Sequence, residues 1–220
     1  MSLRVVVYAE GSGEGARGLP PAPGEPLADS ALGAAHILVR RCLATDAHIP
    51  ESAVRFDSPL RTRGHMPRGS DFLHAQTLAQ LLTWPRPDKQ PDLAVVIVDA
   101  DGDSRRKPTL DEAVSKVRVS RVVAVAVQEF EAWLIADEVA AAAVLGQRLS
   151  RSKDPEQMAR REAKELLKGW LETSTQTDSA AWELRRDIAA RADLEVMAER
   201  CPAFDLFRHE LIQAVRSHRS

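Results

Sequence analysis

Continuous apolar runs alternate with stretches of helical periodicity over the first two thirds of the chain. The runs predict four strands, since they are short, rich in β-branched residues and bounded by turn formers. The predicted strands cover residues 3–9, 53–56, 93–98 and 122–127. Apolar residues at helical spacing predict helices between these strands, at residues 27–43, 70–82 and 109–116. The order of elements is therefore strand, helix, strand, repeated.

The apolar runs at 93–98 and 122–127 are continuous rather than alternating, which is typical of strands buried on both faces of a parallel sheet. Strands joined by helical crossovers make a doubly wound α/β domain, which we expect at residues 1–146. Beyond residue 150 the pattern predicts no strand. The remainder, residues 147–220, is predicted to be a helical C-terminal subdomain.

The predicted helices of this subdomain cover residues 154–169, 178–191 and 203–217. We expect residues 154–217 to be wholly helical. Their large apolar side chains need a partner surface, so they should be buried. These side chains are Leu166, Leu167, Trp170, Phe204 and Phe207.

The composition, 44% hydrophobic and 28% charged, is that of an ordinary globular protein. A net charge of −2 provides no global positive field, so any contact with nucleic acid must be local. Cys42 and Cys201 stand far apart with no zinc-ligand spacing around them, which favours a reducing cytoplasm. No apolar run approaches the roughly 20 residues that span a bilayer, so we expect a cytoplasmic protein with no membrane partner.

Acidic residues follow the first, third and fourth predicted strands. The carboxyl ends of parallel strands meet at one edge of a sheet, where functional sites of such folds lie. Carboxylates gathered there repel one another unless a hard cation neutralises them, and oxygen ligands favour magnesium or manganese. The predicted metal ligands are Glu10, Asp99, Asp101, Asp103 and Glu129. Taken singly, each acid is equally well explained as a solvated turn former.

The segment QEFEAWLIAD after the fourth strand contains two further candidates, Glu129 and Glu131. Their side chains would point the same way on a continuing strand, but would lie about 200° apart on a helix. Only one of them need be functional. Trp133 and its apolar neighbours are expected in the core.

Several better-known motifs partly match segments of this chain, but each lacks a residue or element that the motif requires. Gly11, Gly13 and Ala16 have dinucleotide-binding spacing, but the prolines that follow forbid the helix which that motif opens. DADGD is not a calcium loop, because Leu110 stands where the loop needs a glutamate. Only one strand follows VVIVDADGD, too few for a haloacid-dehalogenase phosphatase, and no phosphate-binding loop of the GxxxxGK[ST] type occurs.

A glutamate after the first strand, DxD after a later one and a glutamate beyond the next together resemble a Toprim domain, the catalytic domain of topoisomerases, primases and OLD-type nucleases. More narrowly, VVVYAEG, VVIVDADGD and VQEFEAWLIAD, followed by a helical tail, resemble an uncharacterised bacterial family placed in the Toprim clan, the domain of unknown function of family 4276 type. The resemblance spans nearly the whole chain, and EFEAWLIAD is its most specific piece.

This resemblance implies a Toprim-like, doubly wound, mainly parallel four-stranded sheet with a C-terminal helical appendage. It makes Glu10 a metal ligand or general acid/base, Asp99 and Asp101 metal ligands, and Glu131 a further catalytic acid. Relatives that cleave DNA carry an ATPase on the same chain or a catalytic tyrosine in another domain. This chain shows neither, and its single tyrosine, Tyr8, lies inside the first strand and should be buried. The functions that remain possible for this chain are hydrolysis and a role inside a larger complex.

Two basic loops emerge at the same edge and could hold a substrate phosphate, since arginine forks bind phosphate bidentately. Arg61, Arg63 and Arg68 follow the second strand, and Arg105 follows DADGD, with Arg106 next to it. A solvated charged loop explains each of them equally well when taken alone.

The leading hypothesis is therefore a magnesium- or manganese-dependent, Toprim-like phosphodiesterase, a nuclease acting on DNA or RNA, with a role in bacterial defence or nucleic-acid processing by family analogy. One alternative is a non-enzymatic Toprim-like subunit that binds a separate ATPase or nucleic acid. Another is a phosphatase or nucleotidyl transferase acting on small substrates. The placement of Glu10, Asp99, Asp101 and Glu131 distinguishes the first alternative, which expects acids that do not converge.

Overall fold

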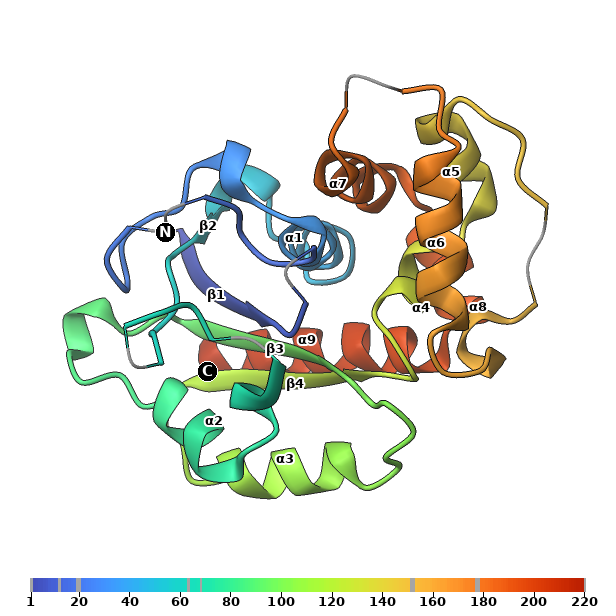
Figure 1. Ribbon diagram of the computed structural model, residues 1–220. Coiled ribbons are helices and arrows are strands. Elements are labelled where there is room, and N and C mark those ends of the chain that lie inside the picture. Colours follow the sequence, from blue (N-terminus) through green and yellow to red (C-terminus); the bar gives the residue numbers. More distant parts are fainter. Residues whose placement is uncertain are drawn as a thin grey trace.

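The computed structural model describes residues 2–11, 13–18, 21–62, 64–67, 69–150, 153–176 and 179–219. Its centre is a four-stranded sheet with strand order β2-β1-β3-β4, in which every pair is parallel (Figure 1). The strands are β1 (Leu3–Ala9), β2 (Val54–Phe56), β3 (Leu93–Asp99) and β4 (Ser120–Ala126). All four predicted strands are confirmed, each within about two residues, because the apolar runs that predict them are the buried strands themselves.

The sheet has a switch in winding direction between β1 and β3. From β1 the chain proceeds to β2 on one side, whereas from β3 it proceeds to β4 on the other. The register pairs Tyr8 with Val96 and Ala9 with Ile97, so β1 and β3 end side by side. In open α/β sheets, ligands bind outside the carboxyl ends of the strands at such a switch point.

Helices cover both faces of the sheet. Val5, Val7 and Val95 pack in a core that includes α1 (Ala34–Asp46) and α9 (Pro202–Arg219). On the other face, alternate residues of the same strands form a core with α2 (Ala75–Leu81) and α3 (Arg106–Val114), as Figure 1 shows. The alternation follows from the period of two along a strand, and it accounts for the continuous apolar runs.

Helix boundaries differ more from the prediction. The predicted helix at 27–43 begins only at Ala34, after a short 3₁₀ helix, Asp29–Ala31. The helix predicted from Ser70 is divided into a 3₁₀ turn, Gly69–Phe72, and α2. Periodicity identifies a helical face but does not fix where hydrogen bonding begins.

Beyond β4 the described chain contains no further strand. The helices α6 (Glu162–Glu172), α7 (Ala181–Arg191), α8 (Leu194–Arg200) and α9 lie in the part that was predicted to be helical, whereas α4 (Glu131–Leu134) and α5 (Glu138–Leu145) precede it and were not predicted. The prediction that 154–217 is wholly helical is wrong, because 158–161 and 173–176 are loops. Leu167, Trp170, Phe204 and Phe207 are buried as expected, whereas Leu166 is half-buried.

The helical region shares one core with the sheet. Trp133 stacks on Phe207 with ring centroids 5.6 Å apart, and both residues belong to the apolar cluster that contains β1 and β3. Arg208 of α9 forms two hydrogen bonds with the carboxylate of Asp46, at 2.9 and 2.7 Å, which fastens α9 to the end of α1. These contacts tie the helical region to the sheet through α9, which packs on one of its faces.

Among the described residues, no helix combines the length and the apolar character that crossing a bilayer requires.

Candidate active site

Glu10 and Asp99 meet at the switch point of the sheet. Glu10 is the first residue after β1, and its Oε2 accepts a hydrogen bond from the backbone N–H of Asp99 at 2.9 Å. Asp99 ends β3, and its Oδ1 accepts from the backbone N–H of Phe130 at 2.8 Å. These two bonds connect the ends of β1 and β3 with the segment that follows β4. The structure thus brings the Glu10 carboxylate to the end of β3, where Asp99 lies.

A turn with left-handed backbone conformation sets the position of Asp101. Its φ of 51° and the φ of 82° at Gly102 place two successive residues in the left-handed region, which few residues other than glycine and aspartate tolerate. Its backbone N–H donates to the carbonyl of Gln128 at 3.3 Å, which anchors the turn beside the end of β4. The Asp101 carboxylate lies 3.2 Å from Arg160 Nε and 3.6 Å from Arg106 Nη1.

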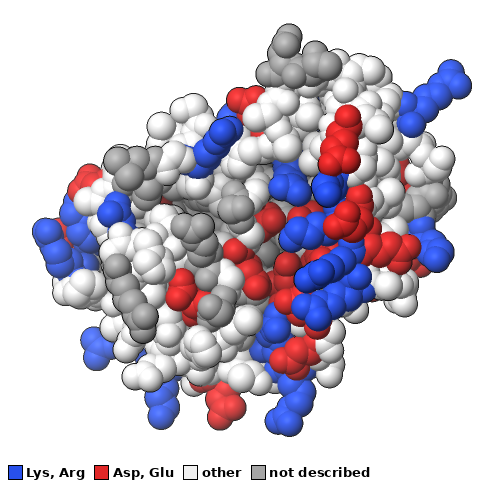
Figure 2. Space-filling model, viewed as in Figure 1, with Lys and Arg blue, Asp and Glu red and all other residues white. Residues whose placement is uncertain are grey.

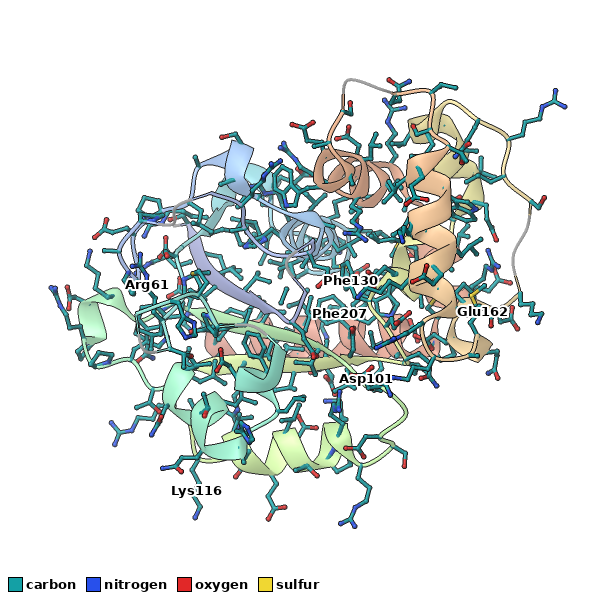
Figure 3. All side chains as sticks on the ribbon, viewed as in Figure 1. Arg61, Asp101, Lys116, Phe130, Glu162 and Phe207 are labelled. Carbon is teal, nitrogen blue, oxygen red and sulfur yellow. The ribbon has the colours of Figure 1, made fainter. Side chains whose placement is uncertain are left out.

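Glu129 and Glu131 are both buried, and they contact the helical region (Figure 3 labels the intervening Phe130). The Oε2 of Glu129 accepts from the backbone N–H of Lys164 at 3.1 Å. Glu131 begins α4, and its Oε1 lies 3.5 Å from Arg185 Nη2 and 3.8 Å from Lys164 Nζ. Its Oε2 is buried and has no hydrogen-bonding partner among the described residues.

Glu14 is a further member of this acidic group that the sequence reasoning missed. It is only 6% exposed, and its carboxylate lies directly over Gly11, where any Cβ would overlap it. Gly13 makes a similar close approach, because a Cβ there would overlap the guanidinium of Arg185. The absence of a Cβ at these two glycines thus leaves room for the buried carboxylate of Glu14 and the largely enclosed guanidinium of Arg185 beside the loop after β1.

The acids influence one another's ionisation. Burial, and then repulsion from Glu14, raise the pKa of Asp99 to about 8. Burial, and then repulsion from Glu131, raise the pKa of Glu14 to about 7. Burial also raises the pKa of Glu10 and of Glu129. Because each negative charge makes the others costlier, the group as a whole favours binding of positive charge.

Among the described residues, four cations contact this acidic group. Arg106 of α3 donates to the carbonyl of Asp99 and faces Asp101, and the other three come from the helical region. They are Arg160, Lys164 and Arg185. Figure 2 shows acidic and basic side chains intermingled along the boundary between the sheet and the helical region.

The donor chemistry of the group suits a hard divalent ion, since every candidate ligand is a carboxylate oxygen, and the neighbouring Glu131 Oε2 is buried without a partner in the described chain. Within the described ranges, no three His, Cys, Asp or Glu side chains are arranged as a ready-made metal group. Glu10 and Asp99 each direct one oxygen at a backbone N–H, and Asp101 faces two arginines. A shared ion among Glu10, Asp99 and Asp101 therefore stays a prediction, and it requires side-chain rearrangement.

The other predicted residues lie differently. Asp103 is exposed, and its Oδ1 accepts from the backbone N–H of Arg105 at 2.9 Å, so it caps the turn before α3. The side chain of Arg105 is exposed, and its neighbour Arg106 is the one that faces the acids. Figure 3 shows Arg61 at the left of the view, away from Asp101 near the centre, and Arg61 Nη2 donates to the carbonyl of Pro21 at 2.9 Å.

The remaining two predicted phosphate contacts, Arg63 and Arg68, lie outside the described residues.

The fold and the site define a parallel α/β protein with an acidic group at its switch point. The chain belongs to the family described as Domain of unknown function (DUF4276), whose model matches residues 34–212. No curated protein and no solved structure matches the chain, so the finer resemblance to Toprim domains stays a prediction. Glu10 and Glu14 precede the matched range.

Proposed function

We propose that this protein is a Toprim-like phosphodiester hydrolase that uses magnesium or manganese to cleave nucleic acid. The observation that carries the proposal is the meeting of Glu10 and Asp99 at the switch point between β1 and β3, with Glu14, Asp101 and Glu131 around them. Buried carboxylates that repel one another cost folding energy, and such an arrangement is typical of sites that bind a cation or move a proton.

The residues would divide the work as follows. Glu14 has a pKa near neutrality, about 7, so its carboxylate can accept the proton of an attacking water at physiological pH. Arg106, which donates to the carbonyl of Asp99, would hold the end of β3 and stabilise negative charge beside Asp101. A magnesium or manganese ion held by Glu10, Asp99 and Asp101 would stabilise charge on the leaving oxygen.

A cytoplasmic setting is part of the proposal, and the two buried free cysteines, Cys42 and Cys201, are consistent with a reducing compartment. A role in bacterial defence or nucleic-acid processing, with or without a separate ATPase, belongs to the same proposal by analogy with Toprim proteins.

The test is hydrolysis by the purified full chain of single- and double-stranded DNA and RNA, with magnesium, manganese or chelator. Asp101→Asn removes a charge but keeps the volume, and it should abolish cleavage. Asp111→Asn is the matched control, because Asp111 is exposed on α3 and pairs with Lys107. Cleavage in chelator, or equal rates in wild type and Asp101→Asn, would overturn the proposal. Mononucleotides and a phosphomonoester in the same assay test the small-substrate alternative.

A second candidate is a non-enzymatic subunit, and the ion pairs of the site favour it. Asp101 and Glu131 already face Arg160 and Arg185, so part of the acidic charge is neutralised within the chain. A wild type that binds nucleic acid but cleaves none of these substrates in either metal supports this candidate and removes the first.

A further inference from the structure

The helical region contributes cations to the acidic group, and two of them have donors left over. Arg160 lies in the loop before α6, and Lys164 lies in the first turn of α6. Arg160 contacts Asp101 and Lys164 contacts Glu131, each through one group only, and both side chains are at least half exposed, at 59% and 50%.

Arg160 faces Asp101 through Nε alone, at 3.2 Å. Its two terminal nitrogens make no hydrogen bond to the residues that the structure describes. Those nitrogens carry four of the five guanidinium donors, in a planar fork that matches a phosphate. The contact with Asp101 thus orients the guanidinium and leaves its binding face open to solvent.

Lys164 lies near several of the acids. Its Nζ lies 3.8 Å from Glu131 Oε1, too far for a hydrogen bond but within reach of an ion pair. Its charge lowers the pKa of Glu10, Glu14 and Glu129, against the larger effect of burial, so it lies near all three. The backbone N–H of Lys164 also donates to Glu129, which fixes the start of α6 at the site.

Arg185 has a different role. It is largely enclosed, with 18% of its side chain exposed, and its guanidinium packs on Gly13 beside Glu131. It serves as an internal counter-ion rather than a solvent-facing donor.

A phosphate cannot approach carboxylates without positive charge between them. Glu131 Oε2, which is buried and lacks a partner in the described chain, indicates that the acids are short of positive charge even with these cations in place. An added cation would relieve that shortage, and Arg160 and Lys164 would then be available to an anion at the rim.

We propose that Arg160 and Lys164 bind the phosphate group of the substrate, so that the site is composite, with acids from the sheet edge and phosphate-binding cations from the helical region. The inference rests on the proposed function, since this phosphate is the one on which the acids act. It assigns phosphate binding to residues beyond position 150 rather than to the loops after β2 and β3.

The test is binding of a fluorescein-labelled single-stranded DNA with phosphorothioate linkages to the full chain in magnesium, followed by fluorescence anisotropy over a range of salt concentrations. Arg160→Ala and Lys164→Ala should each weaken binding about tenfold and reduce the salt slope by about one ion. Arg160→Lys should restore binding only in part, because lysine lacks the fork. Competition with a mononucleotide shows whether one phosphate suffices or a polymer is needed.

Lys168→Ala is the matched control. Lys168 lies one turn further along α6, is 60% exposed and pairs with Glu165 and Glu172 of its own helix, so its loss should leave binding unchanged. Binding by Arg160→Ala and Lys164→Ala equal to that of the control, or no binding by wild type, would overturn the inference.

Binding and hydrolysis measurements distinguish failure of this inference from failure of the proposed function. Binding that depends on Arg160 in a protein that never hydrolyses the substrate supports phosphate binding and removes the enzyme. Hydrolysis with the same KM in wild type, Arg160→Ala and Lys164→Ala supports the enzyme and removes this assignment.

Discussion

Replacing Glu14 by glutamine tests whether the acids at the switch point are held together at the expense of stability. The pKa of Glu14 rises from 4.5 to about 7, chiefly through burial and then through repulsion from Glu131. A tenfold change in a proton-binding constant corresponds to about 1.4 kcal/mol, so ionised Glu14 destabilises the fold by about 3 kcal/mol. Because the pKa of Glu14 is higher in the folded than in the unfolded state, protonated Glu14 favours the folded state. This contribution to the free energy of unfolding is fully present below pH 4.5 and is lost as the pH rises through 7.

Glu14→Gln has the same size but carries no charge. Without divalent ions, it should match wild type at about pH 5 and exceed it by about 2–3 kcal/mol at about pH 8. Urea unfolding in chelator, followed by circular dichroism at both pH values, measures the difference. Glu112→Gln serves as the control, because Glu112 is exposed on α3, and it should change little at either pH. A Glu14→Gln variant no more stable than wild type at the higher pH would refute the reasoning.

Three further predictions concern the fold. Burial lowers the pKa of His36 to about 3, so His36 contributes a loss of about 1.4 kcal/mol of stability per pH unit as the pH falls below about 6.5, and the stability of His36→Leu relative to wild type should rise by that amount per unit in urea titrations. Arg208→Met leaves the largely buried carboxylate of Asp46 unpaired and should cost about 3 kcal/mol, measured by thermal unfolding; an unchanged melting temperature would contradict the pairing. Gly169→Ala, inside α6 with open space around the added methyl group, should stabilise by about 0.5–1 kcal/mol, whereas Gly13→Ala, which displaces Arg185, should destabilise in the same denaturation assay.

The sheet could be predicted from the sequence because its strands are buried on both faces. A continuous apolar run such as 93–98 is typical of a strand buried on both faces of a parallel sheet. Asp99 ends this strand, so the same pattern also places it at the carboxyl edge where the site lies. The Ala-rich helix α5 was not predicted, since its residues show almost no amphipathic periodicity. Its capping aspartate, Asp137, and the left-handed Gly146 were the available signals.

The site was predicted only in part, because its electrostatics depend on long-range contacts. Arg160 meets Asp101 across 59 residues of sequence, and no local pattern marks that pairing. Asp101 and Asp103 look equivalent in DADGD, and only the left-handed backbone at Asp101 separates the acid that faces the site from the one that caps a turn. For Glu14, the spacing of Gly11 and Gly13 is the available signal, but the same spacing also matches an incomplete dinucleotide motif.

Calorimetric titration of manganese into the purified full chain tests the central claim, that the carboxylates at the switch point bind a divalent cation. Asp99, with a pKa of about 8, is largely protonated at neutral pH, so binding should release a proton, visible as a dependence of the heat on the buffer. We predict saturable binding with proton release in wild type and in Asp111→Asn, and none in Asp99→Asn. Manganese binding by Asp99→Asn as tight as by wild type, or no binding by wild type, would contradict the account.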